Sequence, residues 1–534
     1  MAEDPTRELR ELTVQLEELN RIGAALSAER DTSRLLELIL TKARQITESD
    51  AGSLYVVETT PVLAAPDHPA LSAEDDEPLR RLRFKIAQND SVALPFREGV
   101  LDITGHSIAG HVALTGETVI LEDAYVLPAG VPYTFNRSFD DAAGYRTRSV
   151  LAVPMRTPQG NVVGVLQLIN TTRDGVVVPY SARAEALLVS LASQAAVALE
   201  NSHLYAEIRQ LFEGFVRASV VAIEARDPAT SGHSFRVANL TVALAEAAGR
   251  ADSGRFASVR FSREDMRTIR YASLLHDFGK VGVREEVLVK AKKLHPAQIE
   301  RVRERFQLAR RTLEWSALRG QLDYALGHGA EAYRERQAAF EDELAGGTRR
   351  LEQHLAEIEQ ANEPNVLPDG TFDRLREIAR TTFSDVDGTA RPLLQEEEVR
   401  WLSLRKGSLS EREREQIESH VAHTHRFLQQ IPWTREIRRI PAIALGHHEK
   451  LNGTGYPQKL SAPDIPIQTR MMTISDIFDA LSAADRPYKK AVPVERALEI
   501  LDGAVKDGEI DAELFDLFVE ARVYDRWLVE PYAY

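Results

Sequence analysis

Apolar residues recur at two different spacings along the chain, and the change in spacing divides it in two. Over residues 33–201, segments of helical period mix with alternating, strand-like runs such as AGSLYVV, RSVLAVPM and NVVGVLQLIN. From residue 212 onward nearly every segment has a helical period. The chain is therefore predicted to be multidomain, with an α+β domain followed by an all-α domain.

Two further apolar stripes predict helices on either side of the first domain. Leucines from Leu9 to Leu26, spaced mostly by three and four, indicate an amphipathic or coiled-coil helix within residues 1–32. A second stripe runs from Leu188 to Phe215 with one shift of phase, and it predicts a long connecting helix that includes residues 202–222. We expect both helices to contribute to a homodimer.

Residues 314–404 differ from their surroundings and are interpreted as a helical insertion. They are rich in charge, and they predict two helices joined at Gly346-Gly347. The segment before them, KAKKLHPAQIERVRERF, shares its pattern with the segment after them, LRKGSLSEREREQIESH, so the two compete for one structural role. Only the second copy ends in a histidine, His420, where the first has Arg305. The helical domain is thus expected over residues 212–313 and 405–530.

Composition limits where the protein works and which chemistry it can use. The chain has 534 residues with 43% hydrophobic and 28% charged, as in soluble proteins, and its N-terminus is acidic rather than signal-like, so we expect a cytoplasmic protein without a membrane span. The net charge of −15 disfavours duplex nucleic acid as a partner, and a phosphate ligand would need a local group of Lys and Arg. With 0 cysteines, any metal must be held by His, Asp or Glu.

Imidazoles and carboxylates fall where helix geometry directs them toward a common interior. His233 opens an apolar-periodic helix, His420 lies on an apolar stripe, and the pairs His276-Asp277 and His447-His448 each end a helix. Asp476 and Asp479, three apart in TISDIFDAL, share one helical face.

These positions together predict a metal site. A lone histidine on an apolar face is more often a hydrogen-bonded core residue. Adjacent buried imidazoles, however, repel one another when protonated unless a cation takes their lone pairs. Ligands without sulfur suit iron or manganese, with zinc, nickel or cobalt as alternatives. The number of ligands exceeds one tetrahedral ion and fits two divalent ions that share Asp277 as a bridge.

Three motifs, in order, resemble the HD-GYP subgroup of HD-domain metal-dependent phosphohydrolases. They are HDFGK from His276 to Lys280, HHEKLNGTGYP from His447 to Pro457, and SDIFDALSAADRPYKKA from Ser475 to Ala491. The resemblance implies an all-α domain that hydrolyses the bacterial second messenger cyclic di-GMP to pGpG or to GMP. It also implies that the metal ligands are His233, His276, Asp277, His420, His447, His448 and Asp476.

The resemblance further assigns residues to the reaction and to the substrate. Asp277 and Lys280 would be catalytic, and a diguanylate cyclase of the GGDEF type is a candidate partner. Two cations would activate a bridging hydroxide without a side-chain nucleophile. Substrate contacts are expected from Lys280, Arg486 and Lys489 to phosphate, from Asp479 to guanine or another ligand, and from the loop of Gly455, Tyr456 and Pro457 to ligand or partner.

The chain departs from the family pattern at several positions. Lys450 and Asn452 replace an Arg and an Asp of the loop, which changes its ion pairing. Ala229 stands where some members have the glutamate of a third metal site, so two metals are expected. The stretch DRPYKK also lies one residue farther from Asp476 than is usual.

The first domain, over residues 33–201, resembles a GAF sensor domain. The similarity lies in FDDAAGYRTRSVLAVPM from Phe139 to Met155 and in GVLQLIN from Gly164 to Asn170. GAF domains that bind cyclic nucleotides have a signature whose Lys and Asp are missing here. The resemblance therefore does not imply that this domain binds a cyclic nucleotide. The domain is expected to bind another small effector, as yet unknown, or to serve dimerisation alone.

Three functions follow from this pattern. The first is a cyclic di-GMP phosphodiesterase regulated by the GAF domain. The second is an HD phosphohydrolase for another cyclic dinucleotide, such as 3′,3′-cGAMP. The third is a signalling adaptor that binds the messenger without turnover, which the intact ligand set argues against.

Overall fold

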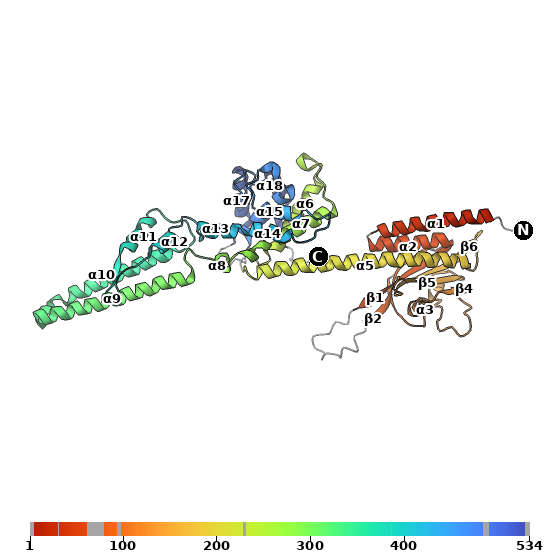
Figure 1. Cartoon of the computed structure of the whole chain (residues 1–534), viewed down its shortest axis with the longest axis horizontal. Helices are drawn as coiled ribbons and strands as arrows, with labels where there is room; N and C mark the ends of the chain where they lie inside the picture. The colour runs from red at the N-terminus through yellow and green to blue at the C-terminus, as the bar shows by residue number, and fades with distance from the viewer. Residues whose placement is uncertain are drawn as a thin grey trace. The chain divides into compact units, whose positions relative to one another are not determined.

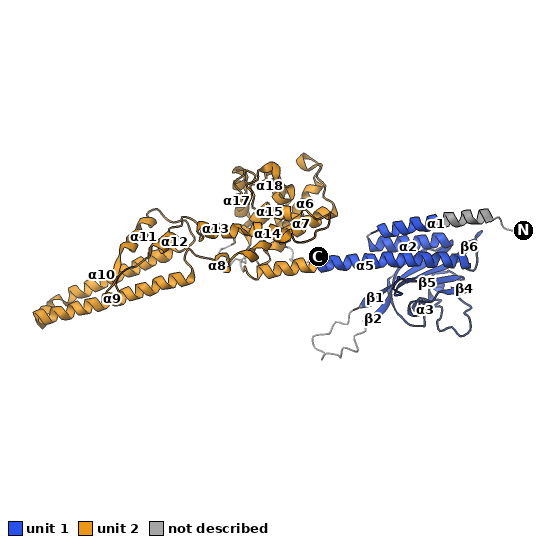
Figure 2. Ribbon diagram, viewed as in Figure 1, with its two compact units in different colours: residues 1–212 blue, residues 213–534 orange. Residues whose placement is uncertain are grey.

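The computed structural model of the chain describes residues 5–29, 31–60, 79–92, 98–227, 231–385, 387–483 and 491–528. Of residues 5–16, 60 and 79 it describes the backbone alone. The chain forms two compact units, residues 1–212 and 213–534 (Figure 2).

The first unit is built on one antiparallel sheet of 7 strands, in the order β3-β2-β1-β6-β5-β4 with β7 paired to β6. The strands are β1 Ser49–Thr60, β2 Leu79–Asn89, β3 Gly99–Asp102, β4 Val119–Leu121, β5 Val150–Arg156, β6 Val162–Arg173 and β7 Val176–Val177. The helices are α1 Pro5–Ala28, α2 Thr32–Thr47, α3 Ile108–Thr115, α4 Ser138–Ala143 and α5 Ala182–Glu224.

Both faces of this sheet are covered, because alternate side chains of a strand point to opposite faces. Helices α1, α2 and α5 lie on one face of the sheet and α3 lies on the other (Figure 1). Leu54 of β1 belongs to the core shared with α1, α2 and α5, whereas Tyr55 packs against the core around α3. Leu54 pairs in register with Leu166 of β6, which pairs with Val153 of β5. The α+β prediction for this domain is therefore confirmed.

Part of helix α1 packs within its own unit. Leu19, Ile22 and Leu26 are buried in the core against the sheet. The earlier leucines of the stripe, up to Leu16, have side chains outside the described residues. The described half of α1 is thus a core helix, and the predicted dimer contact cannot lie on these three side chains.

Helix α5 is 43 residues long, and it begins in the first unit and ends in the second. Leu188, Leu191 and Leu199 are fully buried in the first unit's core. By length and composition alone, α5 is the one described helix that could cross a membrane, and 39% of its most apolar 18-residue stretch is buried. The buried leucines show that the first part of this helix serves as a core helix.

Over its described residues the second unit is helical apart from one two-stranded hairpin, as the periodicity predicts. Its first helices are α6 His233–Arg250, η2 Gly254–Phe256, α7 Arg263–Leu275, η3 Phe278–Gly282 and α8 Glu285–Leu288. Next come α9 Pro296–His328, α10 Ala330–Ala361, α11 Thr371–Arg380, β8 Thr382–Ser384, β9 Ala390–Pro392 and α12 Glu396–Leu402. The last are α13 Glu411–Glu418, α14 His420–Leu428, α15 Ile440–Leu445, η4 Ala462–Asp464, α16 Ile467–Ser482, α17 Val494–Lys506, α18 Ala512–Glu520 and η5 Val523–Leu528.

Helix α16 is the central helix of this unit. Its residues Met471, Ile474 and Phe478 are fully buried and pack with residues of α6, α7, α17 and α18. The amphipathic spacing of α16 places Asp476 and Asp479 among these apolar side chains. Two carboxylates are thereby held inside the domain, where each needs a partner.

Helices α9 and α10 form a long antiparallel hairpin (Figure 1). Residue 314, the predicted start of the insertion, lies inside α9. The prediction that two helices join at Gly346-Gly347 was wrong, because α10 runs through both glycines and the break is at Gly329. A Cβ on Gly347 would lie 2.7 Å from Cδ2 of Leu313, so this glycine allows close packing of the two helices.

Candidate metal centre

The seven predicted metal ligands come from separate helices and converge in the second unit. His233 is the first residue of α6, and His276 directly follows α7. A capping box of Ser410 and Glu413 starts α13, and His420 opens α14 two residues after α13 ends. His447 and His448 follow α15, and Asp476 lies within α16.

Three of the histidines are held by the same device. A carbonyl oxygen three residues earlier accepts a hydrogen bond from each Nδ1: His276 to Ser273 at 2.7 Å, His420 to Ile417 at 2.6 Å and His447 to Ala444 at 2.6 Å. A carbonyl can only accept, so Nδ1 carries the proton and Nε2 of the neutral ring keeps a lone pair. This is the tautomer that a metal ligand requires.

The Nε2 atoms of these histidines lie close to one another. Nε2 of His420 lies 3.4 Å from Nε2 of His447. Nε2 of His276 is buried and has no hydrogen-bond partner within the described part of the chain. Lone pairs set this close repel one another unless a cation lies between them. The residues therefore fit a metal site.

Burial keeps the rings of His420, His447 and His448 neutral. It lowers the pKa of His420, and together with the rings of His448 and His276 it holds the pKa of His447 well below its usual value. Burial also lowers the pKa of His448 to about 4. The rings are thus available as ligands across the physiological pH range.

Asp277 lies between two groups of ligand atoms. One group is His420, His447 and His448. The other is His233 and His276, and Asp277 itself contributes a ligand atom to it. Oδ1 of Asp277 is 3.3 Å from Nε2 of His420, whereas Oδ2 is 3.5 Å from Nε2 of His276. Each oxygen thus faces a different group, as a bridging carboxylate would.

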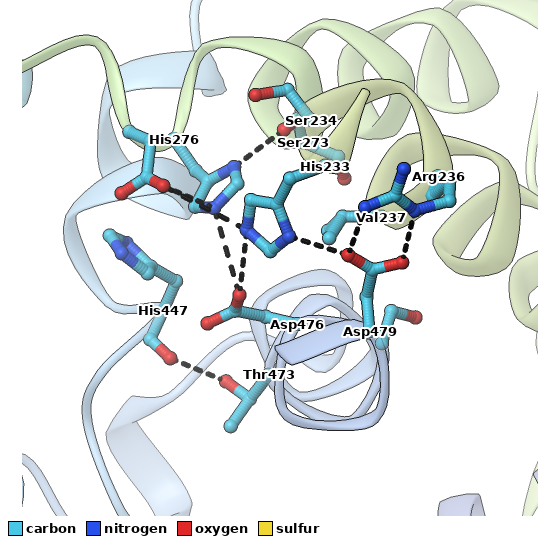
Figure 3. Close-up of polar contacts among 12 residues, drawn as sticks. His233, Ser234, Arg236, Val237, Ser273, His276, His447, Thr473, Asp476 and Asp479 are labelled. Atoms are coloured by element: carbon cyan, nitrogen blue, oxygen red, sulfur yellow. Dashed lines mark hydrogen bonds and ion pairs between the residues drawn. The ribbon is translucent and has the colours of Figure 1, made fainter. Parts of the chain in front are cut away.

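His233 lies between two aspartates of α16 (Figure 3). Its Nε2 is 3.1 Å from Oδ1 of Asp476, and its Nδ1 is 2.7 Å from Oδ2 of Asp479. Burial opposes a charged ring, but the hydrogen bonds with both aspartates raise the pKa of His233 to about 9. Metal binding at Nε2 would therefore release a proton.

Asp479 was predicted to contact guanine or another ligand. It is fully buried, and besides His233 it accepts a hydrogen bond from Nε of Arg236 at 2.6 Å (Figure 3). This placement favours a role in orienting His233. Arg236 was not predicted, although it lies three residues after His233 on the same helical face.

Lys280 is held by two carboxylates. Its Nζ lies 2.9 Å from Oδ2 of Asp277 and 3.0 Å from Oδ2 of Asp227. Burial opposes the charge, but these carboxylates raise the pKa of Lys280 above its usual value. Its charge is thus permanent and lies beside the proposed bridging ligand. Asp227 was missed, because only the fold brings it to Lys280.

The predicted loop of Gly455, Tyr456 and Pro457 borders the site. The Tyr456 ring lies 4.8 Å from the ring of His448, Pro457 is exposed, and a Cβ on Gly455 would lie 2.5 Å from the Cα of Glu449. The position thus requires glycine.

The two departures in this loop have partners of their own. Lys450 pairs with Glu509 at 2.6 Å, and Nδ2 of Asn452 donates to the carbonyl of Asp507. Predicted residues Arg486 and Lys489, and Ala229 at the third-metal position, lie outside the described residues.

Two threonines that sequence reasoning missed support the ligand histidines. Oγ1 of Thr424 donates to the carbonyl of His276 at 2.9 Å, and Oγ1 of Thr473 donates to the carbonyl of His447 at 2.9 Å. Thr424 lies four residues after His420 and Thr473 three before Asp476. Helical spacing to a ligand was thus the available signal.

Comparison with known families supports the two-part organisation. Residues 31–199 match the GAF domain, and residues 230–343 and 397–514 each match an HD domain. The GAF and HD assignments made from the motifs are confirmed. The stretch between the two HD matches contains α11, β8 and β9.

Relatives of known activity match short parts of the chain. A 3′3′-cGAMP-specific phosphodiesterase of Vibrio cholerae is 40% identical over 109 residues, which cover 20% of this chain and 23% of the relative. A cyclic di-GMP phosphodiesterase response regulator of Xanthomonas campestris is 38% identical over 98 residues, 18% of this chain and 25% of the relative. A cyclic di-GMP phosphodiesterase of Pseudomonas aeruginosa is 38% identical over 79 residues, 15% and 18% respectively. The matches span a quarter or less of these relatives.

Proposed function

We propose that this chain, which combines a GAF domain with an HD domain, is a metal-dependent phosphodiesterase that hydrolyses cyclic di-GMP to pGpG or on to GMP. The observation that carries the proposal is the position of Asp277 between two groups of inward-facing ligand atoms. The relatives named cyclic di-GMP phosphodiesterases support the substrate class. Because the substrate is a cytoplasmic messenger, the proposed activity belongs in the cytoplasm.

The chain's own residues divide the work. Two divalent ions, with iron or manganese preferred by the donor atoms, would be held by the seven ligands and would supply an activated hydroxide and charge neutralisation. Asp277 would bridge them, and Asp479 and the three backbone carbonyls fix the ring orientations. Lys280 supplies a fixed positive charge beside Asp277, which favours an anionic phosphodiester in a chain of net charge −15.

A second substrate has its own support. The Vibrio cholerae relative at 40% identity is named for 3′3′-cGAMP. Both cyclic dinucleotides present the same phosphodiester and differ in one base, so the metal centre does not distinguish them. The choice depends on base contacts, and both substrates belong in the test.

The test joins metal content to product analysis. Protein purified without oxygen is expected to carry close to two metal ions per chain and to convert cyclic di-GMP to linear products, measured by chromatography. Asp277→Asn, which keeps the shape of the side chain, is expected to lose most of the metal and at least 100-fold of the rate. Equal turnover by both proteins would refute the catalytic role of this centre. Metal-loaded protein that binds but does not hydrolyse either dinucleotide would favour the adaptor.

We also propose that the chain acts as a homodimer through α5. Beyond the core of the first unit, α5 exposes a stripe with spacings of four, three and four, formed by Leu204, Ile208, Leu211 and Phe215. Such a stripe suits the seam of a parallel two-stranded coiled coil with a second copy. The GAF domain would then regulate through this helix.

A further inference from the structure

The last turn of α5 is bonded to the first residues of the helix that carries His233. Gly232 precedes α6 and has no side chain that could cap it. The carboxylate of Glu224 takes this place: one oxygen accepts the N–H of Gly232 at 2.8 Å, and the other accepts the N–H of Ser234 at 3.1 Å. The two bonds flank His233. A negative charge at a helix N-terminus is also electrostatically favourable.

Arg226 and Asp227, shortly after this turn, hold a second part of the centre. Nη1 of Arg226 donates to the carbonyl of Val281 at 2.7 Å, and Nη2 donates to the carbonyl of Val283 at 3.4 Å. Asp227 is buried and pairs with Lys280. The segment Lys280–Val283, which begins three residues after Asp277, is thus bonded to side chains of the residues that follow α5.

We infer that Glu224, Arg226 and Asp227 are positioning residues of the metal centre. They set where His233 begins α6 and how Lys280 stands beside Asp277. The inference rests on the proposed function only in taking the same ligands to hold metal. The end of α5, which contains no predicted ligand, would thus help to fix the positions of residues that are ligands. A displacement of the end of α5 would therefore move the imidazole of His233 and, through Lys280, the carboxylate of Asp277.

The physical effect follows from the bonds that each residue makes. Without the second oxygen of Glu224, one buried N–H beside His233 loses its acceptor, and the helix start shifts to recover one. Without the charge of Asp227, Lys280 turns wholly to Asp277 and competes with cations for that carboxylate. Both changes weaken metal binding. Loss of a partner that orients a ligand typically lowers metal affinity 10- to 100-fold.

The test measures the binding of Mn²⁺ alone to the full-length chain. The variants are Glu224→Gln, which keeps size but removes one acceptor oxygen, and Asp227→Asn, which removes only the charge. The matched control is Glu207→Gln, a carboxylate on the exposed part of the same helix. Free Mn²⁺ is followed by electron paramagnetic resonance, and the metal-free proteins are melted in parallel.

We expect the Kd for Mn²⁺ to rise about ten-fold in both variants and to stay unchanged in the control. Wild-type affinity in Glu224→Gln and Asp227→Asn, with a lowered melting temperature alone, would mean a purely structural role and would overturn the inference. If Glu224→Gln does not fold, Asp227→Asn decides. Wild-type protein that binds Mn²⁺ without hydrolysing a cyclic dinucleotide would defeat the proposed function and leave this inference standing. A wild type that binds no Mn²⁺ would defeat both.

Discussion

At the scale of single residues, Lys293 is the least expected side chain of the second unit. It is fully buried, and its Nζ donates to the carbonyl of Leu402 at 3.2 Å. Burial lowers the pKa of Lys293 to about 8. The folded chain thus binds the proton less tightly than the unfolded chain, whose lysine keeps the usual value near 10.5.

Lys293→Met is expected to raise the free energy of unfolding at pH 7 by roughly 2 kcal/mol, because the cost of a buried charge disappears. Between pH 8 and about 10.5 only the unfolded wild type stays protonated, so wild-type stability rises with pH relative to the variant. Urea unfolding at several pH values measures this difference. Lys292→Met, at the neighbouring exposed lysine paired with Glu363, serves as the control and should change stability by less than about 0.5 kcal/mol. A difference that does not depend on pH would contradict the assignment.

Residue types and helical spacing were enough to predict which histidines and aspartates the fold brings together, but not the groups that orient them. His276-Asp277 and His447-His448 stand out because paired buried ionisable groups need a cation. Glu224 and Asp227 carry no such signal, since their partners are fixed only when the end of α5 meets α6 and η3. Gly279 is similar: a Cβ there would overlap the carbonyl of His420, which no periodicity reveals.

At the scale of elements, the α9/α10 hairpin separates into a base and an outer part. The base has a core with α11 and α12 that includes Val302, Phe306, Ala309, Ile358 and Leu375. Near this base, Nζ of Lys290 pairs with Glu413 at 2.9 Å and lies 3.8 Å from the Trp401 ring. Glu413 starts α13, which leads to His420. The base of the hairpin is therefore connected to the candidate metal centre through α13. The outer part of the hairpin does not belong to the core formed with α11 and α12.

Replacing residues 314–346 with a short glycine-rich turn is expected to leave Mn²⁺ affinity within about two-fold of wild type, because every predicted ligand lies outside the hairpin. The matched comparison is Glu413→Gln near the base of the hairpin. This change leaves Lys290 buried without its anion and should cost roughly 3 kcal/mol of stability. Both proteins are compared by metal titration and thermal melting. Loss of metal binding on shortening the hairpin would show that its outer part supports the site.

The boundaries of these elements were harder to predict than their type. Charge-rich helical sequence predicts the hairpin, but glycine was taken as its turn, and Gly347 instead lets α10 approach Leu313. The first copy of the repeated segment continues as α9, and Arg305, at the place of His420, pairs with Glu398 at 2.5 Å. The repeated pattern does not decide between the two copies, and the fold places the second copy, with His420, beside other predicted ligands.

At the scale of the whole molecule, the proposed dimer gives a direct measurement. Ile208→Asp with Leu211→Asp places charges on the exposed stripe of α5 and should convert a dimer of 59.6 kDa chains into monomers. Ala206→Asp with Gln210→Asp adds the same charge away from the stripe and should leave the dimer intact. Light scattering coupled to gel filtration gives the mass. A monomeric wild type, or a stripe variant that stays dimeric, would exclude α5 as the seam.

The two-domain order followed from the sequence because each domain has its own periodicity and motifs. The course of α5 was less apparent, since one helix changes surroundings along its length. Its apolar positions are buried at Leu188 and exposed at Leu211. A stripe alone cannot tell a core contact from a contact with another chain, and only the fold shows which residues the sheet covers.

The histidines that close helix ends have an evolutionary consequence. Three histidines help to end a helix: His276, His420 and His447. The Nδ1 of each donates a hydrogen bond to a carbonyl in the last turn of α7, α13 and α15 respectively. A lineage that abandoned the chemistry would lose these helix-end hydrogen bonds with any of the three rings, whereas a change of Asp277 would take from Lys280 one of the two carboxylates that hold it. Inactive descendants that changed Asp277 should therefore also have changed Lys280 and kept the imidazoles.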